Sequence, residues 1–194
     1  DGTKDGNIDL NVTGDILLSG GGAAGQSGAF GLIGHGGTNS DGAKTGTITL
    51  DADGATGLTI DGGVGPDAYA QVGHGGIRST GAVDQPITVN LNAAGRAFAL
   101  NAGSGGGSYA QLGHGGTEAT GAKSGRIELN NADSLSVAGD GGYAQLGHGG
   151  ANGAGGNVGG DIVVTPASMN TSGISVSGGS TDNAYGLIGN GGIG

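Results

Sequence analysis

Four histidines recur along the chain and are the side chains best suited to chemistry. Each lies in a Gly-His-Gly-Gly sequence, and a fifth copy has Asn instead: His35, His74, His114, His148 and Asn190. A column of imidazoles could bind a transition metal, but each His has only glycines beside it and Asn is a poor ligand for such metals. We therefore expect no metal here. Because His and Asn both tolerate positive φ, the sequence predicts a tight corner instead.

Each His belongs to a repeated eight-residue sequence, typically Tyr-Ala-Gln-Leu-Gly-His-Gly-Gly, which we call the octet. The octets span 30–37, 69–76, 109–116, 143–150 and 185–192. Their first position is aromatic throughout: Phe30, Tyr69, Tyr109, Tyr143 and Tyr185. Their third position is Leu in the first and last copies and Gln in the others: Gln71, Gln111 and Gln145. If the octets stack, these positions predict an aromatic column, an amide ladder and an imidazole ladder that must stay neutral.

Two strand-like segments precede each octet. The first has the pattern Ile-x-Leu or Ile-x-Val and starts at Ile8, Ile48, Ile87, Ile127 and Ile162, at intervals of 40, 39, 40 and 35 residues. The second is shorter and starts at Ile16, Leu58, Phe98, Leu135 and Ile174. Both alternate apolar with polar residues, which is the period of a strand, and no stretch carries the stripe of an amphipathic helix.

These periods predict an all-β protein, a parallel, right-handed β-solenoid. Its five units of about 39 residues each carry three short strands, and stacking of the units buries the apolar face that one unit cannot bury alone. The expected units span about 1–41, 42–81, 82–120, 121–156 and 157–194 and form one repeat domain. We favour one coil per unit, with two smaller coils as the alternative. The Ile positions should then form a column, and the residues that follow them should point outward: Asp9, Thr49, Thr88, Glu128 and Val163.

Spacing distinguishes the corners of each unit. The octet aromatic is always 18 or 19 residues before the next Ile, whereas the two strand segments lie 8 to 12 residues apart. Variable lengths are typical of loops that tolerate insertion, so the stretch after the octet is expected to be ordered. That stretch contains Gly-Ala-Lys-Thr-Gly at 42–46 and Gly-Ala-Lys-Ser-Gly at 121–125.

The composition argues against several functions. The chain has 6 basic and 16 acidic residues, a net charge of −10, which disfavours nucleic acid or an anionic membrane as partner. It has no Cys, hence no disulfide and no Cys-based zinc site. No apolar run is long enough for a membrane-spanning helix, so we expect no membrane insertion. Because it starts at Asp1 without Met and stops after an octet, we expect a processed chain or a piece of a longer one.

We expect no catalytic residue, no enzyme activity and no cofactor. Every His is a member of the repeat, whereas a catalytic site is normally a singular feature, and the acidic residues lie mainly in turns. Calcium is the one ion with a partial motif: Gly-Gly-Val-Gly-Pro-Asp at 62–67 matches half of a calcium-binding nonapeptide. That motif works in tandem, and it occurs here once.

The Ile-x-Leu segments together with the Tyr-Ala-Gln-Leu-Gly-His-Gly-Gly octet resemble the repeats of giant bacterial surface adhesins similar to filamentous haemagglutinin. The resemblance implies secretion, an extracellular or cell-surface location, and a structural or adhesive role in a fibre that supports biofilm or cell–cell contact. We expect two kinds of partner. One is a further coil bound end to end, either in a longer chain or in another subunit, and the other is a cell-surface glycan or another cell. The alternatives are a β-helix that binds or cleaves carbohydrate, and an ice-binding solenoid, although only Thr47-Ile48-Thr49 approaches the Thr-x-Thr pattern that ice binding needs.

Overall fold

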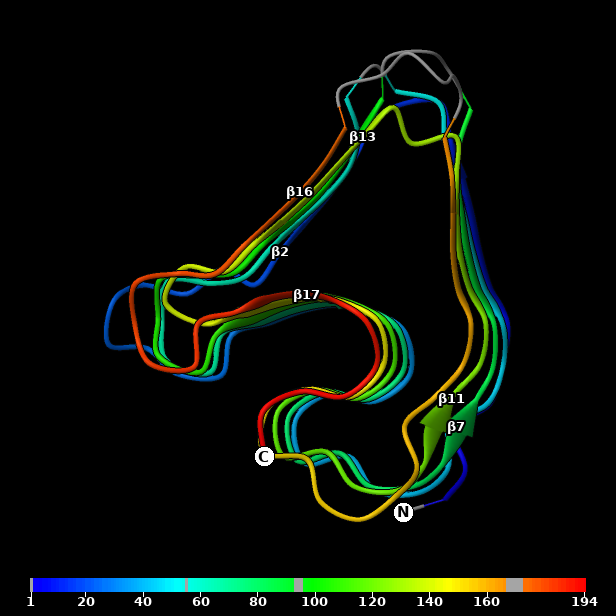
Figure 1. Cartoon of the computed structure of the whole chain (residues 1–194). Helices are drawn as coiled ribbons and strands as arrows, with labels where there is room; N and C mark the ends of the chain where they lie inside the picture. The colour runs from blue at the N-terminus through cyan, green and yellow to red at the C-terminus, as the bar shows by residue number, and fades with distance from the viewer. Residues whose placement is uncertain (1, 55, 93–95, 167–172) are drawn as a thin grey trace.

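Every unit of the repeat contributes one strand to each of three parallel, five-stranded sheets (Figure 1). The computed structural model describes residues 2–54, 56–92, 96–166 and 173–194. The first sheet contains β1 (Ile8–Val12), β4 (Ile48–Ala52), β8 (Ile87–Leu91), β12 (Ile127–Asn130) and β15 (Ile162–Thr165). The second contains β2 (Ile16–Ser19), β5 (Gly57–Asp61), β9 (Ala97–Asn101), β13 (Ser134–Ala138) and β16 (Gly173–Ser177).

The third sheet, which we call the octet sheet, is built from the start of each octet. It contains β3 (Phe30–Ile33), β6 (Tyr69–Val72), β10 (Tyr109–Leu112), β14 (Tyr143–Leu146) and β17 (Gly186–Ile188). A two-stranded sheet pairs β7 (Val83–Asp84) with β11 (Lys123–Ser124) in the stretch after the octet. No helix occurs among the described residues, so none there is long and apolar enough to cross a membrane.

Strand register confirms the β-solenoid and one coil per unit. In the first sheet Ile48 pairs with Ile8 and with Ile87, one unit away on either side. From β1 to β15 the chain therefore makes four full turns, and the alternative of two smaller coils per unit is wrong. The Ile positions form the expected column. The next residue in each strand is at least partly exposed, including Asp9, Thr49 and Glu128.

The last four residues of each octet form a loop that we call the hook. Seen nearly along the solenoid axis, the octet strand runs back from the left-hand corner of the coil and ends in this curl (Figure 1). Glycines on both sides of His114 give the hook its shape: Gly113, Gly115 and Gly116 have φ of 150°, 120° and 128°. Only glycine adopts such values without strain.

The octet sheet is buried on both faces. All four residues of β6, β10 and β14 are buried. Ala110 and Leu112 belong to the main core, together with the inward residues of the first and second sheets, whereas Tyr109 belongs to a second, smaller core with Tyr69, Tyr143 and Ile77. A strand buried on both sides needs no alternation of apolar and charged residues. This explains why the octet carries neutral residues throughout.

Candidate functional site

The aromatic residues of the octets form one continuous stack. Ring centroids of successive coils lie 4.7–5.0 Å apart with planes within 8° of parallel, from Phe30 through to Tyr185. Tyr69, Tyr109 and Tyr143 are at most 2% exposed. Burial raises the pKa of Tyr69 to about 12 and holds the pKa values of Tyr109 and Tyr143 well above the usual 10. These phenols are inaccessible to any substrate.

The four histidines form a second stack, and hydrogen bonds determine which nitrogen carries the proton on three of the rings. Centroids are 4.9–5.1 Å apart. The backbone N–H groups of His35, His74 and His114 each donate to Nδ1 of the His in the next coil, at 2.9–3.0 Å. Nε2 of His114 lies 2.8 Å from the carbonyl oxygen of Gln85. Because Nδ1 accepts and the carbonyl can only accept, the proton must sit on Nε2. His74, His114 and His148, whose Nδ1 atoms all accept such a bond, are therefore neutral imidazoles.

Asn190 ends this ladder by reproducing both bonds of a neutral imidazole. Its Oδ1 accepts from the backbone N–H of His148 at 3.0 Å, and its Nδ2 donates to the carbonyl of Gly160 at 2.8 Å. His and Asn are thus interchangeable here because each offers one acceptor and one donor in the required directions. The expectation of positive φ at these positions is wrong: the left-handed residues of the hook are the neighbouring glycines, not His35, His74, His114, His148 or Asn190.

Burial also keeps the imidazoles neutral. It lowers the pKa of His74, of His148 and most of all of His114, which is fully buried in the middle of the ladder. The neighbouring His148 lowers the pKa of His114 further, because two stacked imidazolium ions would repel. No group of three or more His, Asp or Glu within the described residues is arranged to hold a metal ion.

The three glutamines form a third column, but not the expected amide ladder. Nε2 of Gln71 donates to the carbonyls of Gly113 and Gly115, in the hook one coil further on, at 2.9 and 3.3 Å. Gln111 does the same with the next hook. Each amide thus ties a strand to the following hook rather than to another amide, and all three Gln side chains are fully buried.

Two buried lysines form a fourth feature, which no chemical motif in the sequence indicates. Lys44 and Lys123 are 1% and 2% exposed. Nζ of Lys44 donates to the carbonyls of Ser40, Gly42 and Thr80 at 3.0, 2.8 and 2.6 Å. Nζ of Lys123 likewise donates to three carbonyls at 2.6–2.9 Å. Burial lowers the pKa of each ammonium to about 8. The only sequence signal was the constant spacing of the Gly-Ala-Lys stretches.

The lysines occupy one register position, and a valine separates the two buried ones. Register and bridges align Lys4, Lys44, Val83, Lys123 and Val158 in successive coils. Between the two buried ammonium groups, Val83 is 1% exposed and carries no charge. The coil that contains Val83 supplies a carbonyl to each lysine: that of Thr80 accepts from Lys44, and that of Gly81 accepts from Lys123. The valine keeps the two like charges two coils apart.

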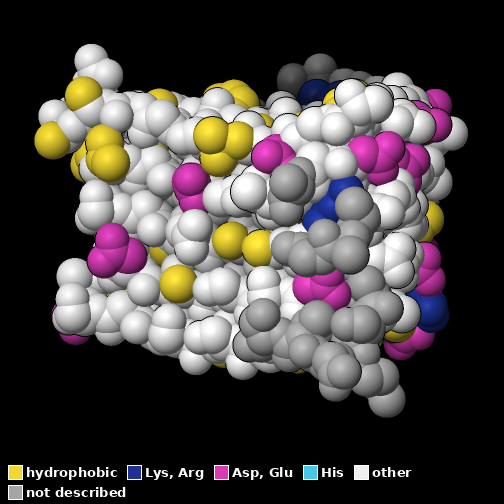
Figure 2. Space-filling model, turned by 90° about the horizontal axis from the view of Figure 1, so that it is seen from above, with side chains coloured by type: hydrophobic (Ala, Val, Ile, Leu, Met, Phe, Trp, Pro, Cys, Tyr) yellow, Lys and Arg dark blue, Asp and Glu magenta, His cyan; other side chains and the backbone are white. Residues whose placement is uncertain are grey.

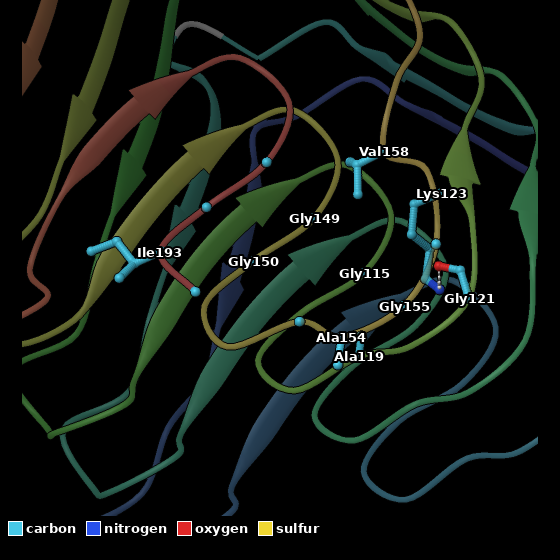
Figure 3. A pocket seen from close by; sticks show the side chains of 15 residues that line it. Gly115, Ala119, Gly121, Lys123, Gly149, Gly150, Ala154, Gly155, Val158 and Ile193 are labelled. Carbon is cyan, nitrogen blue, oxygen red and sulfur yellow. Dashed lines mark hydrogen bonds between the residues drawn. The ribbon is translucent and has the colours of Figure 1, made fainter.

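The column ends at a cavity. Val158, in the last coil, is 38% exposed and lines a cavity of about 200 Å³. Lys123, Gly155, Val158 and Ile193 are among the residues that line it, together with glycines of three hooks (Figure 3). The lining is mostly backbone, so the cavity offers carbonyl and amide groups more than side chains.

The half-motif for calcium lies at a corner of the coil. Asp67 has φ of 55°, and its carboxylate lies 3.8 Å from the guanidinium of Arg78, which also pairs with Glu118 at 2.8 Å. Acidic side chains occur at several separate places on the side of the solenoid shown in Figure 2. Exposed ion pairs of this kind contribute little stability.

The columns therefore direct the stacked imidazole, amide and phenol groups and the two buried ammonium groups toward neighbouring coils. In comparisons with protein-family models, curated proteins and solved structures, nothing matches the chain.

Proposed function

We propose that this chain is a rigid structural segment of an extracellular bacterial surface fibre, with a role in adhesion or contact between cells. The observation that carries the proposal is the commitment of the imidazole, amide, phenol and ammonium groups to contacts between coils. In the interior coils these side chains are 0–2% exposed. Groups held in this way stiffen the solenoid along its axis and are withdrawn from reaction with a substrate.

The outer surface supports the same proposal. The net charge of −10 keeps the rod soluble and suits a solvated fibre. The resemblance of the octet repeats to those of giant surface adhesins supports the extracellular location. In repeat proteins each unit contacts only its neighbours, so length can grow without a change in cross-section.

The test is to locate the native protein. Antibodies raised against the chain should label thin surface fibres in immunogold electron microscopy of intact source cells, and should detect the protein in the surface-sheared fraction. Labelling confined to the cytosolic fraction of lysed cells would refute the proposal. A strain that lacks the gene provides the control for antibody specificity.

A further inference from the structure

The two ends of the solenoid leave core columns uncovered. Ile174 and Val176, in β16 of the last coil, are 65% and 47% exposed, although Leu135 and Val137, their register partners in β13, are 3% and 0% exposed. At the other end Phe30 is 47% exposed, whereas Tyr69 above it is fully buried. The apolar surface at each end is therefore the same surface that every interior coil buries against its neighbour.

Hydrogen-bonding groups at the two ends are complementary. Along the His ladder each backbone N–H donates toward the C-terminal end, to the next coil. The ladder thus finishes with the N–H of Asn190, for which no described residue provides an acceptor, and starts with Nδ1 of His35, for which none provides a donor. A donor at one end and an acceptor at the other match only in a head-to-tail arrangement.

The lysine column leaves its first ammonium with fewer partners than the others. The column has no polarity of its own, because Lys44 takes a carbonyl from the following coil and Lys123 takes one from the preceding coil. Lys4, in the first coil, donates to two carbonyls, those of Asp41 at 2.6 Å and Gly2 at 3.4 Å, whereas Lys44 and Lys123 each have three. Lys123 takes one of its three carbonyls from Gly81, in the preceding coil. The cavity beside Val158, which is lined mostly by glycines, lies at the equivalent position at the end of the column (Figure 3).

Glycines leave room for another coil at the C-terminal end. A Cβ on Gly149 would lie 2.4 Å from the carbonyl oxygen of Gly191, so these hooks pack at backbone distance. Gly191 itself has nothing within 4 Å of the equivalent point. The space that a following hook would need is open.

We infer that the C-terminal end of the solenoid binds the N-terminal end of a second copy of this chain, in continued register. Asn190 N–H then donates to Nδ1 of the second copy's His35, and the ammonium of the second copy's Lys4 lies at the mouth of the cavity beside Val158. This arrangement rests on the proposed fibre function and specifies how such a fibre is joined. It continues the aromatic, imidazole and lysine columns across the junction, and it places Leu187 beside the second copy's Leu32 in the column that contains the glutamines.

Continued register makes a covalent test possible because the chain has no Cys. Val163 of one copy would lie beside Asp9 of the next, since both occupy the outward position in the column that contains Glu128 and Thr49. Paired strands are about 4.8 Å apart, within the range for a disulfide, whereas Asp9 and Val163 of one chain are four coils apart. The double variant D9C/V163C should therefore bridge only between molecules.

The experiment oxidises D9C/V163C at about 0.5 M salt, where repulsion between chains of net charge −10 is screened. Non-reducing electrophoresis should show a ladder of covalent oligomers. The matched control T49C/E128C carries the same number of thiols two coils apart on the side of the rod, and should remain monomeric. Only monomers from D9C/V163C, or dimers from D9C alone through a face-to-face contact, would overturn the inference while leaving the cellular location of the protein untouched.

Two further substitutions in the D9C/V163C background test the details. Gly191→Ala places a methyl group where the next hook must pack, and should reduce the oligomers at least tenfold while circular dichroism shows a folded chain. Lys4→Met keeps the length of the side chain and removes the ammonium, and should reduce the oligomers several-fold. Oligomers unaffected by Gly191→Ala would overturn the stacked geometry, and oligomers unaffected by Lys4→Met would overturn the role of the ammonium.

Discussion

Acidification should destabilise the solenoid through its His ladder, and the substitution His114→Asn should relieve part of this effect. In the folded chain Nδ1 of His114 accepts a backbone N–H from His74, so protonation there breaks a bond between coils. Burial and the neighbouring His148 hold the pKa of His114 well below that of an unfolded His, about 6.5. The unfolded state therefore binds more protons below pH 6.5, and stability falls as the pH falls.

The size of the effect follows from linkage. Each His that stays neutral in the folded state but titrates at about 6.5 when unfolded loses about 2 kcal/mol of folding free energy between pH 8 and pH 5. His114 should contribute this full amount because its pKa is depressed most. His74 and His148 add to it, since their pKa values are lowered in the same direction.

The His114→Asn variant provides the comparison. Asn190 shows that an amide at this register position makes both bonds without titrating. Urea unfolding followed by far-ultraviolet circular dichroism would give the free energy of unfolding of both proteins at pH 8 and at pH 5. We expect the variant to lose about 2 kcal/mol less than the wild type between the two pH values. Equal losses in both proteins, or no loss in the wild type, would refute the neutral-ladder argument.

Three further predictions concern packing and the tyrosines. Tyr109→Ala, in the middle of the stack, should cost about 3–5 kcal/mol in urea unfolding, and Phe30→Ala, at its exposed end, clearly less; equal losses would contradict the stacking argument. Gly115→Ala should prevent native folding, as judged by circular dichroism, because its Cβ would lie 2.2 Å from the carbonyl oxygen of Gly149. Gly191→Ala has a similar φ but open space around its Cβ, so it should lower the stability only by the backbone strain of about 1–3 kcal/mol. Burial raises the pKa of all four tyrosines, so the free energy of unfolding should fall above pH 10. Absorbance at 295 nm should then show no tyrosinate at pH 10.5 until urea unfolds the chain, and ionisation in the folded chain at that pH would contradict the burial of the tyrosines.

The sequence was sufficient to predict the β-solenoid because its periods are strict. Alternation at Ile48 and Leu50 specifies an inward face, and recurrence at near-constant intervals specifies which strands lie side by side. Identical residues at equal spacing then predict columns without further information. The aromatic stack follows from this logic alone, since register places Tyr109 between Tyr69 and Tyr143.

The roles of the polar columns could not be predicted in the same way. The sequence shows that Gln71 and Gln111 stack, but only the curl of the hook places the next coil's carbonyls within reach of their amides. The exchange of His for Asn suggested backbone conformation, whereas the structure explains it by hydrogen bonding. The burial of Lys44 depends on carbonyls from two different coils, which no local pattern reveals.

The closure of every polar column between adjacent coils has a consequence for how such a gene can change. Each interior octet donates to the next hook and accepts from the previous one through equivalent atoms, so a coil inserted or removed as a whole finds its partners already in place. Unequal recombination between the similar octet-coding stretches would produce such changes. A deletion of a few residues between an octet and the following Ile would instead shift one column against the others. Length is therefore free to evolve in whole coils, while the interior of each coil is held nearly fixed.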